Sequence, residues 1–184
     1  SGLIEPRETV LVQPEIEGQA IKKLRADVGD VVMAGAVLAE LSDRSLILQK
    51  GELVAAAAAA RAAVAQAEAQ ILEAQATADE ALRVNDRTRA LKGQGTMSQA
   101  QADQAQAAAT AATSRLSAAT QGKAAALAQL AQAEAQLENV ELQLRRTRVT
   151  APVSGRIVTR NATVGAIASG AGLPMFTLIR DDRL

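Results

Sequence analysis

Residues 102–144 read ADQAQAAATAATSRLSAATQGKAAALAQLAQAEAQLENVELQL. A seam of mostly apolar residues repeats every seven positions through this stretch, and a second seam follows three positions behind it. The first seam consists of Ala102, Ala109, Leu116, Lys123, Leu130, Leu137 and Leu144, and the second consists of Ala105, Ala112, Ala119, Ala126, Ala133 and Val140. This is the a/d pattern of a coiled coil, and a strict seven-residue repeat predicts a left-handed supercoil.

A matching, looser pair of seams lies earlier in the chain. Its members are Ala57, Val64, Ile71 and Ala78, with Ala60, Ala67, Ala74 and Ala81. The glycine-containing segment 93–97 separates the two arms, so they should fold back as an antiparallel helical hairpin over 51–147, with its tip near 92–98. At 1.5 Å per residue each arm would be about 60 to 70 Å long. A globular core needs much less, which favours a spacer or a docking arm.

Lys123 interrupts the apolar seam of the second arm. Its aliphatic stem can pack in the seam while the ammonium group reaches water. Alternatively, a polar residue at this position can set the register of the two helices.

Short apolar runs, separated by residues that favour turns, flank the hairpin on both sides. Before it lie Val10–Val12, Ala20–Ile21, Val31–Val32 and Val37–Ala39, and after it lie Val149–Val158, Val164–Ala168 and Pro174–Ile179. We expect positive φ angles at Gly29 and Gly35, and we expect Val32, Val37 and Leu38 to face a small core.

Neither flank offers enough strands to be stable alone, so the two should close one small β domain together. The expected fold is α+β, with a coiled-coil hairpin inserted into a discontinuous β-sandwich. Residues 1–8 form a lead-in segment, 9–50 the first half of the β domain, and 148–180 the second half.

Composition excludes several classes of function. The chain has no Cys and no His, which removes zinc sites built on those ligands, thiol nucleophiles and histidine acid–base catalysis. Its net charge is zero and Phe176 is its one aromatic residue, so it lacks the basic excess and stacking surface of a nucleic-acid-binding protein. No apolar run is long enough for a membrane span. We expect neither an enzyme nor a nucleic-acid partner.

Two charged clusters can be interpreted either as ordinary surface charges or as functional sites. Glu15 and Glu17 are paired acids that we expect to be solvated. Arg145, Arg146 and Arg148 stand at the end of the second arm, where they suit the negative end of the helix dipole. A basic binding patch is the alternative for the arginines.

The flanks also resemble a known domain. Residues 28–41 resemble the first half of a biotinyl/lipoyl domain, and Ala151-Pro152-Val153-Ser154-Gly155-Arg156-Ile157 resembles the start of its second half. A lipoyl-like domain split by a helical hairpin resembles the bacterial periplasmic adaptor proteins, also called membrane fusion proteins. The resemblance covers essentially the whole chain, and the adaptors of resistance-nodulation-division efflux pumps are closest in shape.

This resemblance implies an adaptor subunit of a tripartite multidrug efflux pump. Such an adaptor bridges an inner-membrane transporter and a TolC-like outer-membrane channel, and associates with copies of itself in a ring, hexameric in the assembled pump. The implied location is the periplasm of a Gram-negative bacterium, with the full-length protein anchored to the inner membrane. Residues 181–184 would then lead towards a β-barrel domain. An adaptor of an ABC-type exporter of macrolides or proteins is the alternative, and a cofactor-carrying domain is a third.

The segment Arg87-x3-Leu91-x6-Ser98-x6-Ala105 resembles the tip motif of adaptors that dock onto TolC-like channels. The resemblance implies that Arg87, Leu91 and Ser98 contact the channel, with Ala105 as the closing apolar position. The residues also have a purely structural interpretation. Ser98 and Gln101 have the spacing of a capping box, and Arg87 and Leu91 share a helical face.

A true biotinyl or lipoyl carrier needs a lysine at the exposed turn between its halves. Asp43 occupies that position here, within Leu41-Ser42-Asp43-Arg44. A carboxylate cannot form the amide that holds the cofactor. We therefore predict no attached cofactor.

Overall fold

The computed structural model describes residues 7–181, which divide into two compact units. Among the described residues, the first unit joins 7–52 with 138–181, and the second spans Leu53–Leu137.

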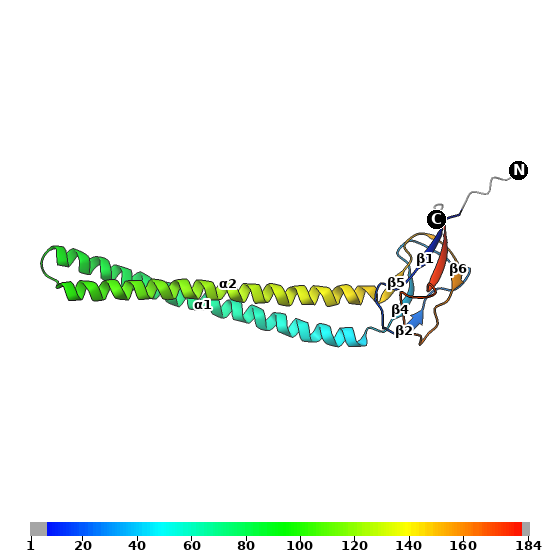
Figure 1. Cartoon of the computed structure of the whole chain (residues 1–184), viewed down its shortest axis with the longest axis horizontal. Helices are drawn as coiled ribbons and strands as arrows, with labels where there is room; N and C mark the ends of the chain where they lie inside the picture. Colours follow the sequence, from blue (N-terminus) through cyan, green and yellow to red (C-terminus); the bar gives the residue numbers. More distant parts are fainter. Residues whose placement is uncertain (1–6, 182–184) are drawn as a thin grey trace. The chain divides into compact units, whose positions relative to one another are not determined.

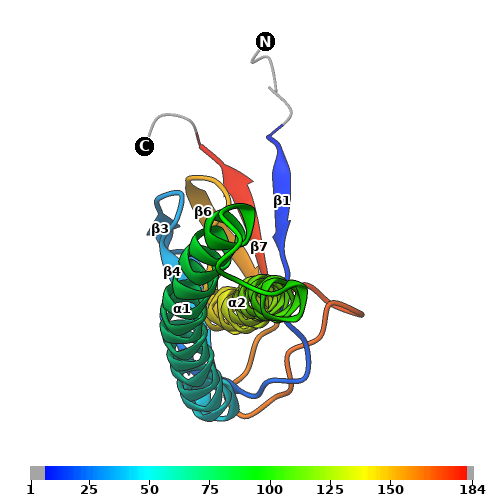
Figure 2. The same ribbon diagram turned by 90° about the vertical axis from the view of Figure 1, so that its left-hand side faces the viewer.

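Two small antiparallel sheets form the first unit (Figure 1). Their strands are β1 (Thr9–Val12), β2 (Ile21–Leu24), β3 (Val31–Val32), β4 (Val37–Leu41), β5 (Arg148–Thr150), β6 (Gly155–Arg160) and β7 (Phe176–Arg180). One sheet has the order β1-β7-β6-β3, visible in Figure 2, and the other has the order β2-β4-β5. The pairs β1–β7, β3–β6 and β4–β5 each join a strand before the helices to one after them. Strands from the two flanks of the helices thus pair with one another in both sheets.

The core of this unit draws on both flanks and both sheets. Leu38 of β4 is fully buried, as are Phe176 and Leu178 of β7, and Ile157 of β6 is almost fully buried. Burial of that many large side chains contributes on the order of 2 kcal/mol each. The two sheets thus share one hydrophobic core.

The prediction that Val37 faces the core is wrong. Val32 and Leu38 are buried as predicted, but Val37 is only partly buried and lies outside the core, whereas Ala39 is fully buried. The β4–β5 ladder shifts register between Val37 and Ala39. This bulge breaks the alternation of inward and outward side chains, so consecutive residues Leu38 and Ala39 both point inward.

Two turns of this unit, one before the helices and one after them, make equivalent backbone hydrogen bonds. Each glycine N–H donates to an isoleucine carbonyl, and the N–H of that isoleucine donates to the carbonyl of the residue after the glycine. The bonds are Gly29 N to Ile157 O (2.8 Å), Ile157 N to Asp30 O (2.9 Å), Gly165 N to Ile21 O (2.9 Å) and Ile21 N to Ala166 O (2.8 Å). These two sets of hydrogen bonds are therefore related in an approximately twofold manner, with the two flanks exchanging roles.

Both predicted glycine turns are present, but one expected strand does not form. Gly29 and Gly35 have positive φ angles of 91° and 85°, as predicted. Residues 164–168 do not form the expected strand, and only Ile167 forms an isolated bridge, to Ala20. Gly165 has a φ of 89°, which turns the chain and interrupts regular pairing.

The helices are α1 (Arg44–Gly93) and α2 (Gln99–Arg146), of 50 and 48 residues. At 1.5 Å per residue these are about 75 and 72 Å long. Helix α1 begins before the expected boundary at residue 51. The Asp43 carbonyl accepts the first helical hydrogen bond, from Ile47 N (2.9 Å), and Leu46 is buried, so packing holds the first turns. Gly51 remains inside the helix, although glycine costs about 1 kcal/mol there.

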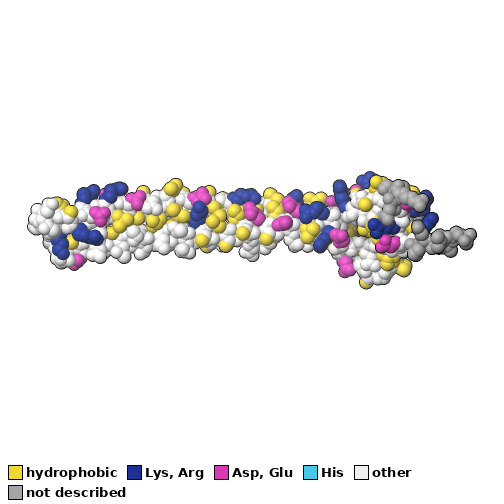
Figure 3. All heavy atoms as spheres, turned by 90° about the horizontal axis from the view of Figure 1, so that it is seen from above, with side chains coloured by type: hydrophobic (Ala, Val, Ile, Leu, Met, Phe, Trp, Pro, Cys, Tyr) yellow, Lys and Arg dark blue, Asp and Glu magenta, His cyan; other side chains and the backbone are white. Residues whose placement is uncertain are grey.

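The seam residues predicted for both arms are all buried or partly buried. The antiparallel pairing of the arms is therefore confirmed. Ion pairs between the two helices join Arg61 to Glu134 (3.9 Å) and Lys123 to Glu68 (3.4 Å). In Figure 3 a band of hydrophobic side chains runs along the two helices with charged side chains beside it.

Candidate docking site at the hairpin tip

The turn between the helices is built from backbone hydrogen bonds. Gly95 has a φ of 80°, its N–H donates to the Lys92 carbonyl (2.9 Å), and Thr96 N–H donates to the Leu91 carbonyl (3.0 Å). These bonds form a Schellman motif, which ends α1 by satisfying its last carbonyls. The Thr96 hydroxyl adds a second bond to the same Leu91 carbonyl (2.9 Å). The tip is thus a defined turn, placed where the sequence predicted it.

Ser98 begins the second helix with the predicted capping box. Its Oγ accepts the Gln101 N–H (3.2 Å), and Gln101 Oε1 accepts the Ser98 N–H (3.0 Å). Two otherwise unsatisfied backbone donors are paired in this way. Ser98 itself is exposed, so the capping interaction leaves part of its side chain open to solvent.

Arg87 and Leu91 lie on the last two turns of α1 and are both exposed. The Arg87 guanidinium pairs with Glu80 at 3.9 Å, a distance that contributes little at the surface. Leu91 has 37% of its surface accessible. An exposed leucine one helical turn from an arginine, beside a defined turn, offers an apolar contact with a cation next to it.

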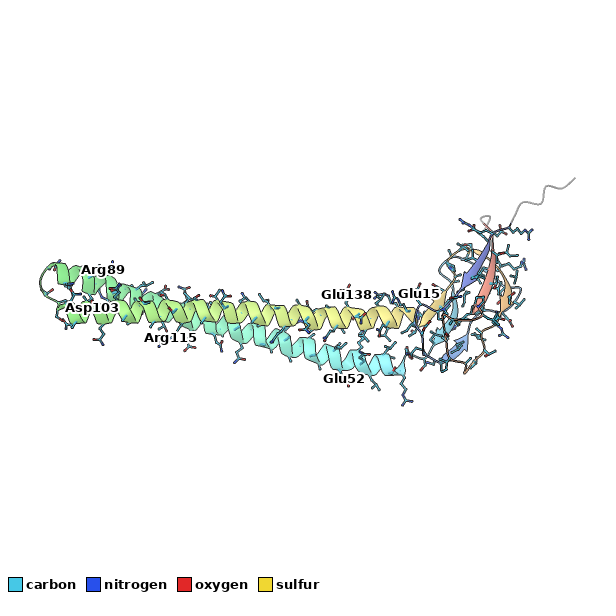
Figure 4. All side chains as sticks on the ribbon, in the orientation of Figure 1. Glu15, Glu52, Arg89, Asp103, Arg115 and Glu138 are labelled. Atoms are coloured by element: carbon cyan, nitrogen blue, oxygen red, sulfur yellow. The ribbon has the colours of Figure 1, made fainter. Side chains whose placement is uncertain are left out.

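Other charged side chains surround the tip. Figure 4 shows Arg89 of α1 and Asp103 of α2 at the same level of the two helices. Lys92 Nζ donates to Gln99 Oε1 across the turn, and Gln99 Nε2 donates to Asp103 Oδ1 (2.7 Å). A chain of polar contacts therefore links the end of α1 to the first turn of α2.

Ala105, the fourth residue of the motif, is buried in the seam with 9% exposure. The sequence placed it both in the second seam of α2 and in the docking motif. Its position in the interface lets the two helices approach closely. Arg87, Leu91 and Ser98 are therefore each exposed near the turn, whereas Ala105 is buried between the helices.

Two buried polar residues near the tip were not expected from the sequence. Asn85 and Thr88 are 8% and 7% exposed. They continue the α1 seams by one heptad beyond Ala78 and Ala81, so extending the seven-residue repeat would have found them. A polar residue at such a position favours one register over its alternatives, at some cost in stability.

Lys123 combines features of both interpretations proposed for it. Its side chain is 36% exposed and its Nζ lies 3.4 Å from Glu68 Oε1 on α1. The ammonium therefore reaches the surface, and there it meets an acidic partner on the other helix.

Asp43, the residue at the expected carrier-lysine position, directly precedes α1. Its carbonyl begins the helix, as described above, so the region is a strand-to-helix junction. Nearby, Arg25 Nη2 donates to Glu40 Oε1 (3.0 Å), and this bond lowers the pKa of the Glu40 carboxyl. The positive charges of Arg25, Lys23 and Arg148 act in the same direction. Within residues 7–181, neither helix has a stretch apolar enough to cross a bilayer.

Comparison with known proteins shows what this fold resembles. No protein-family model matches the sequence, and no curated protein matches it either. Among solved structures, the periplasmic adaptor protein EmrA matches with a TM-score of 0.56 and 15% identity over 94% of this chain and 72% of its own. A candidate efflux transporter from Bacteroides eggerthii matches with a TM-score of 0.53 and 22% identity over 97% of this chain and 41% of its own.

A third solved structure, MacA from Actinobacillus actinomycetemcomitans, matches with a TM-score of 0.50 and 21% identity. The match covers 95% of this chain and 53% of MacA, so the chain spans about half the length of that protein. These likenesses show that the chain has the fold found in a periplasmic adaptor protein.

Proposed function

We propose that the chain is the hairpin-bearing part of a periplasmic adaptor in a tripartite efflux pump. In this role it bridges an inner-membrane transporter and a TolC-like outer-membrane channel, and the tip of its hairpin contacts the channel. It acts as a coupling element and catalyses no reaction. The corresponding location is the periplasm of a Gram-negative bacterium.

One observation supports this proposal above the others. A heptad hairpin of about 70 Å ends in a defined turn that presents Arg87, Leu91 and Ser98 at its surface. A hairpin of this length buries few large side chains, and its alanine seams contribute little area per residue. A role in contacting a distant partner explains such an element better than a role in forming a hydrophobic core.

We infer that the β unit is a lipoyl-like scaffold without a cofactor. The approximate twofold relationship of the turns at Gly29 and Gly165 supports a lipoyl-like arrangement. Asp43 stands where a carrier would have its lysine, and a carboxylate cannot accept biotin or lipoate through an amide. In the assembled pump we expect this unit to pack beside copies of itself in a ring, hexameric as in the adaptors that it resembles.

The test is capture of outer-membrane channel proteins on the immobilised chain, with and without substitutions at the tip. A TolC-like channel should be retained by the natural chain and lost with Leu91→Ser and Arg87→Asp. The inner-membrane protein that copurifies with the full-length protein would distinguish a resistance-nodulation-division pump from an ABC-type exporter. Equal retention of the channel by both tip variants would overturn the docking assignment.

A further inference from the structure

Three arginines line one pocket of the β-containing unit, where α2 passes into β5. The pocket has a volume of about 230 Å³, and all its lining residues belong to the first unit. They are Glu15, Leu142, Arg145, Arg146, Arg148, Val149 and Thr150. Figure 4 labels Glu15, which comes from the loop between β1 and β2.

The charges of this pocket do not balance. Glu15 is the one acidic residue of the lining, and its Oε2 lies 3.6 Å from Arg146 Nε. That distance is longer than a good hydrogen bond, and within residues 7–181 Arg146 Nε is buried without a hydrogen-bond partner. The lining thus carries three guanidinium groups and one carboxylate, which leaves an excess of positive charge in the pocket.

The remaining arginines have no competing acid of their own in the pocket. Arg145 forms no ion pair among the described residues. Arg148 lies opposite Glu40 in the β4–β5 ladder, but the Glu40 carboxylate is already hydrogen-bonded to Arg25. Both guanidinium groups therefore have donors to spare.

The helix dipole explains part of the cluster. Arg145 and Arg146 lie in the last turn of α2, where cations are favourable. Arg148 lies beyond the helix, on β5, and Glu15 reaches the pocket from another loop. The convergence of these elements on one pocket needs a further explanation.

We propose that this pocket binds a small oxyanion, a carboxylate or a phosphate, and that Glu15 competes with that anion for Arg146. Guanidinium groups match both kinds of anion, because their parallel N–H donors pair with two oxygens at once. The site is separate from the docking tip, and its assignment does not depend on the proposed adaptor role. Glu15 holds Arg146 in place when no anion is bound and gives way when one binds.

The experiment is an NMR titration of the purified chain at low ionic strength, with inorganic phosphate in one arm and succinate in the other. Saturable shifts of the Arg146 and Arg148 Nε–H signals are expected in at least one arm, and the arm that saturates identifies the class of anion. Arg148→Gln should weaken binding about tenfold, because it removes a charge-assisted hydrogen bond.

Glu15→Gln provides the decisive variant, because a purely structural salt bridge and a competitor predict opposite results. If Glu15 competes, removing its charge should tighten binding by up to about fivefold, the range of a surface ion pair. Arg61→Gln is the matched control and should leave binding unchanged, because Arg61 belongs to the second unit and does not line the pocket. Weaker or equal binding by Glu15→Gln would overturn the proposal, as would shifts that never saturate or that Arg61→Gln alters equally, which would indicate general screening.

Discussion

Ser98 and Gln101 cap each other at the start of α2, with Ser98 Oγ accepting the Gln101 N–H and Gln101 Oε1 accepting the Ser98 N–H. The same serine belongs to the proposed docking motif. Its two roles can be separated, because aspartate also caps helices well but adds a negative charge at the surface.

Ser98→Ala should destabilise the first turn of α2 by about 1 kcal/mol, because the Gln101 N–H loses its partner. Hydrogen exchange of the amides of residues 99–102 should become faster, while the rest of α2 is unchanged. Ser98→Asp should retain the protection. If Ser98 also contacts the channel, Ser98→Asp should weaken channel capture although the cap is intact. Unchanged exchange in Ser98→Ala would show that the capping box is not what protects this turn.

Leu91→Ser should abolish crosslinking to the channel without unfolding the hairpin, because Leu91 is exposed and its backbone contacts at the turn remain. The measurement is crosslinking yield in cells, alongside the thermal midpoint of the purified chain. Leu72→Ser is the matched control. Leu72 is a leucine on the same helix, is 72% exposed and lies away from the tip. Loss of crosslinking in both variants would point to a general effect of surface hydrophobicity.

The hairpin was predictable because its information is local and repeated. The seven-residue repeat fixed which residues of α2 would be buried, and Gly95 with Ser98 marked the turn. The start of α1 was not predictable in the same way, because Gly51 looks like a break, whereas the helix begins at Arg44 and Leu46 in its first turn is buried. Tertiary packing there overrides local propensity.

The β unit was predictable in outline but not in detail. Short apolar runs located most strands, and the pairing of the flanks followed from their individual weakness. The inward-facing residues of β4 could not be read from alternation, because the bulge beside Leu38 depends on the partner strand. At the tip, the exposure of Arg87 and Leu91 could not be derived from the motif, and Ala105 had two incompatible predicted environments until the structure placed it in the seam.

Gly155→Ala should strongly destabilise the β unit, because a β-carbon on Gly155 would overlap with the backbone carbonyl of Ile179. Backbone atoms in a sheet cannot move aside easily, so we expect a loss of about 2 kcal/mol or more. Gly170→Ala is the control, since its β-carbon would meet side-chain atoms of Glu17 and Gln13 and no backbone atom. Chemical denaturation of the two variants should therefore give different midpoints. Similar midpoints would contradict the close approach of the two strands.

The pKa of Glu40 should lie below its ordinary value in an NMR titration, mainly because Arg25 donates a hydrogen bond to the carboxylate. A carboxyl whose folded-state pKa is depressed stabilises the fold above its unfolded-state pKa. That contribution is lost as pH falls through the folded-state pKa. Arg25→Gln should raise the pKa of Glu40 and make the unfolding midpoint less sensitive to pH in the acidic range. An unchanged Glu40 titration in Arg25→Gln would remove the hydrogen bond as its cause.

Asn85→Leu should raise the thermal stability of the hairpin while making its register less uniform. Asn85 is buried in an otherwise alanine-rich interface, and leucine replaces its amide with apolar atoms in a side chain of the same branching, so a gain of about 1 kcal/mol is expected. Small seam residues repeat every seven positions, so a slipped pairing buries almost the same surface, and the polar residue is what penalises it.

The chain has no cysteine, so spin labels can be placed on cysteines at Leu72 and Gln121, which face solvent on the two helices. The distance between them should have one narrow distribution in the natural sequence and a broader one in Asn85→Leu. Lys123→Leu is the companion variant, because it removes the ion pair with Glu68 and should broaden the distribution further when combined with Asn85→Leu. A narrow distribution in the double variant would mean that the tip turn alone fixes the register.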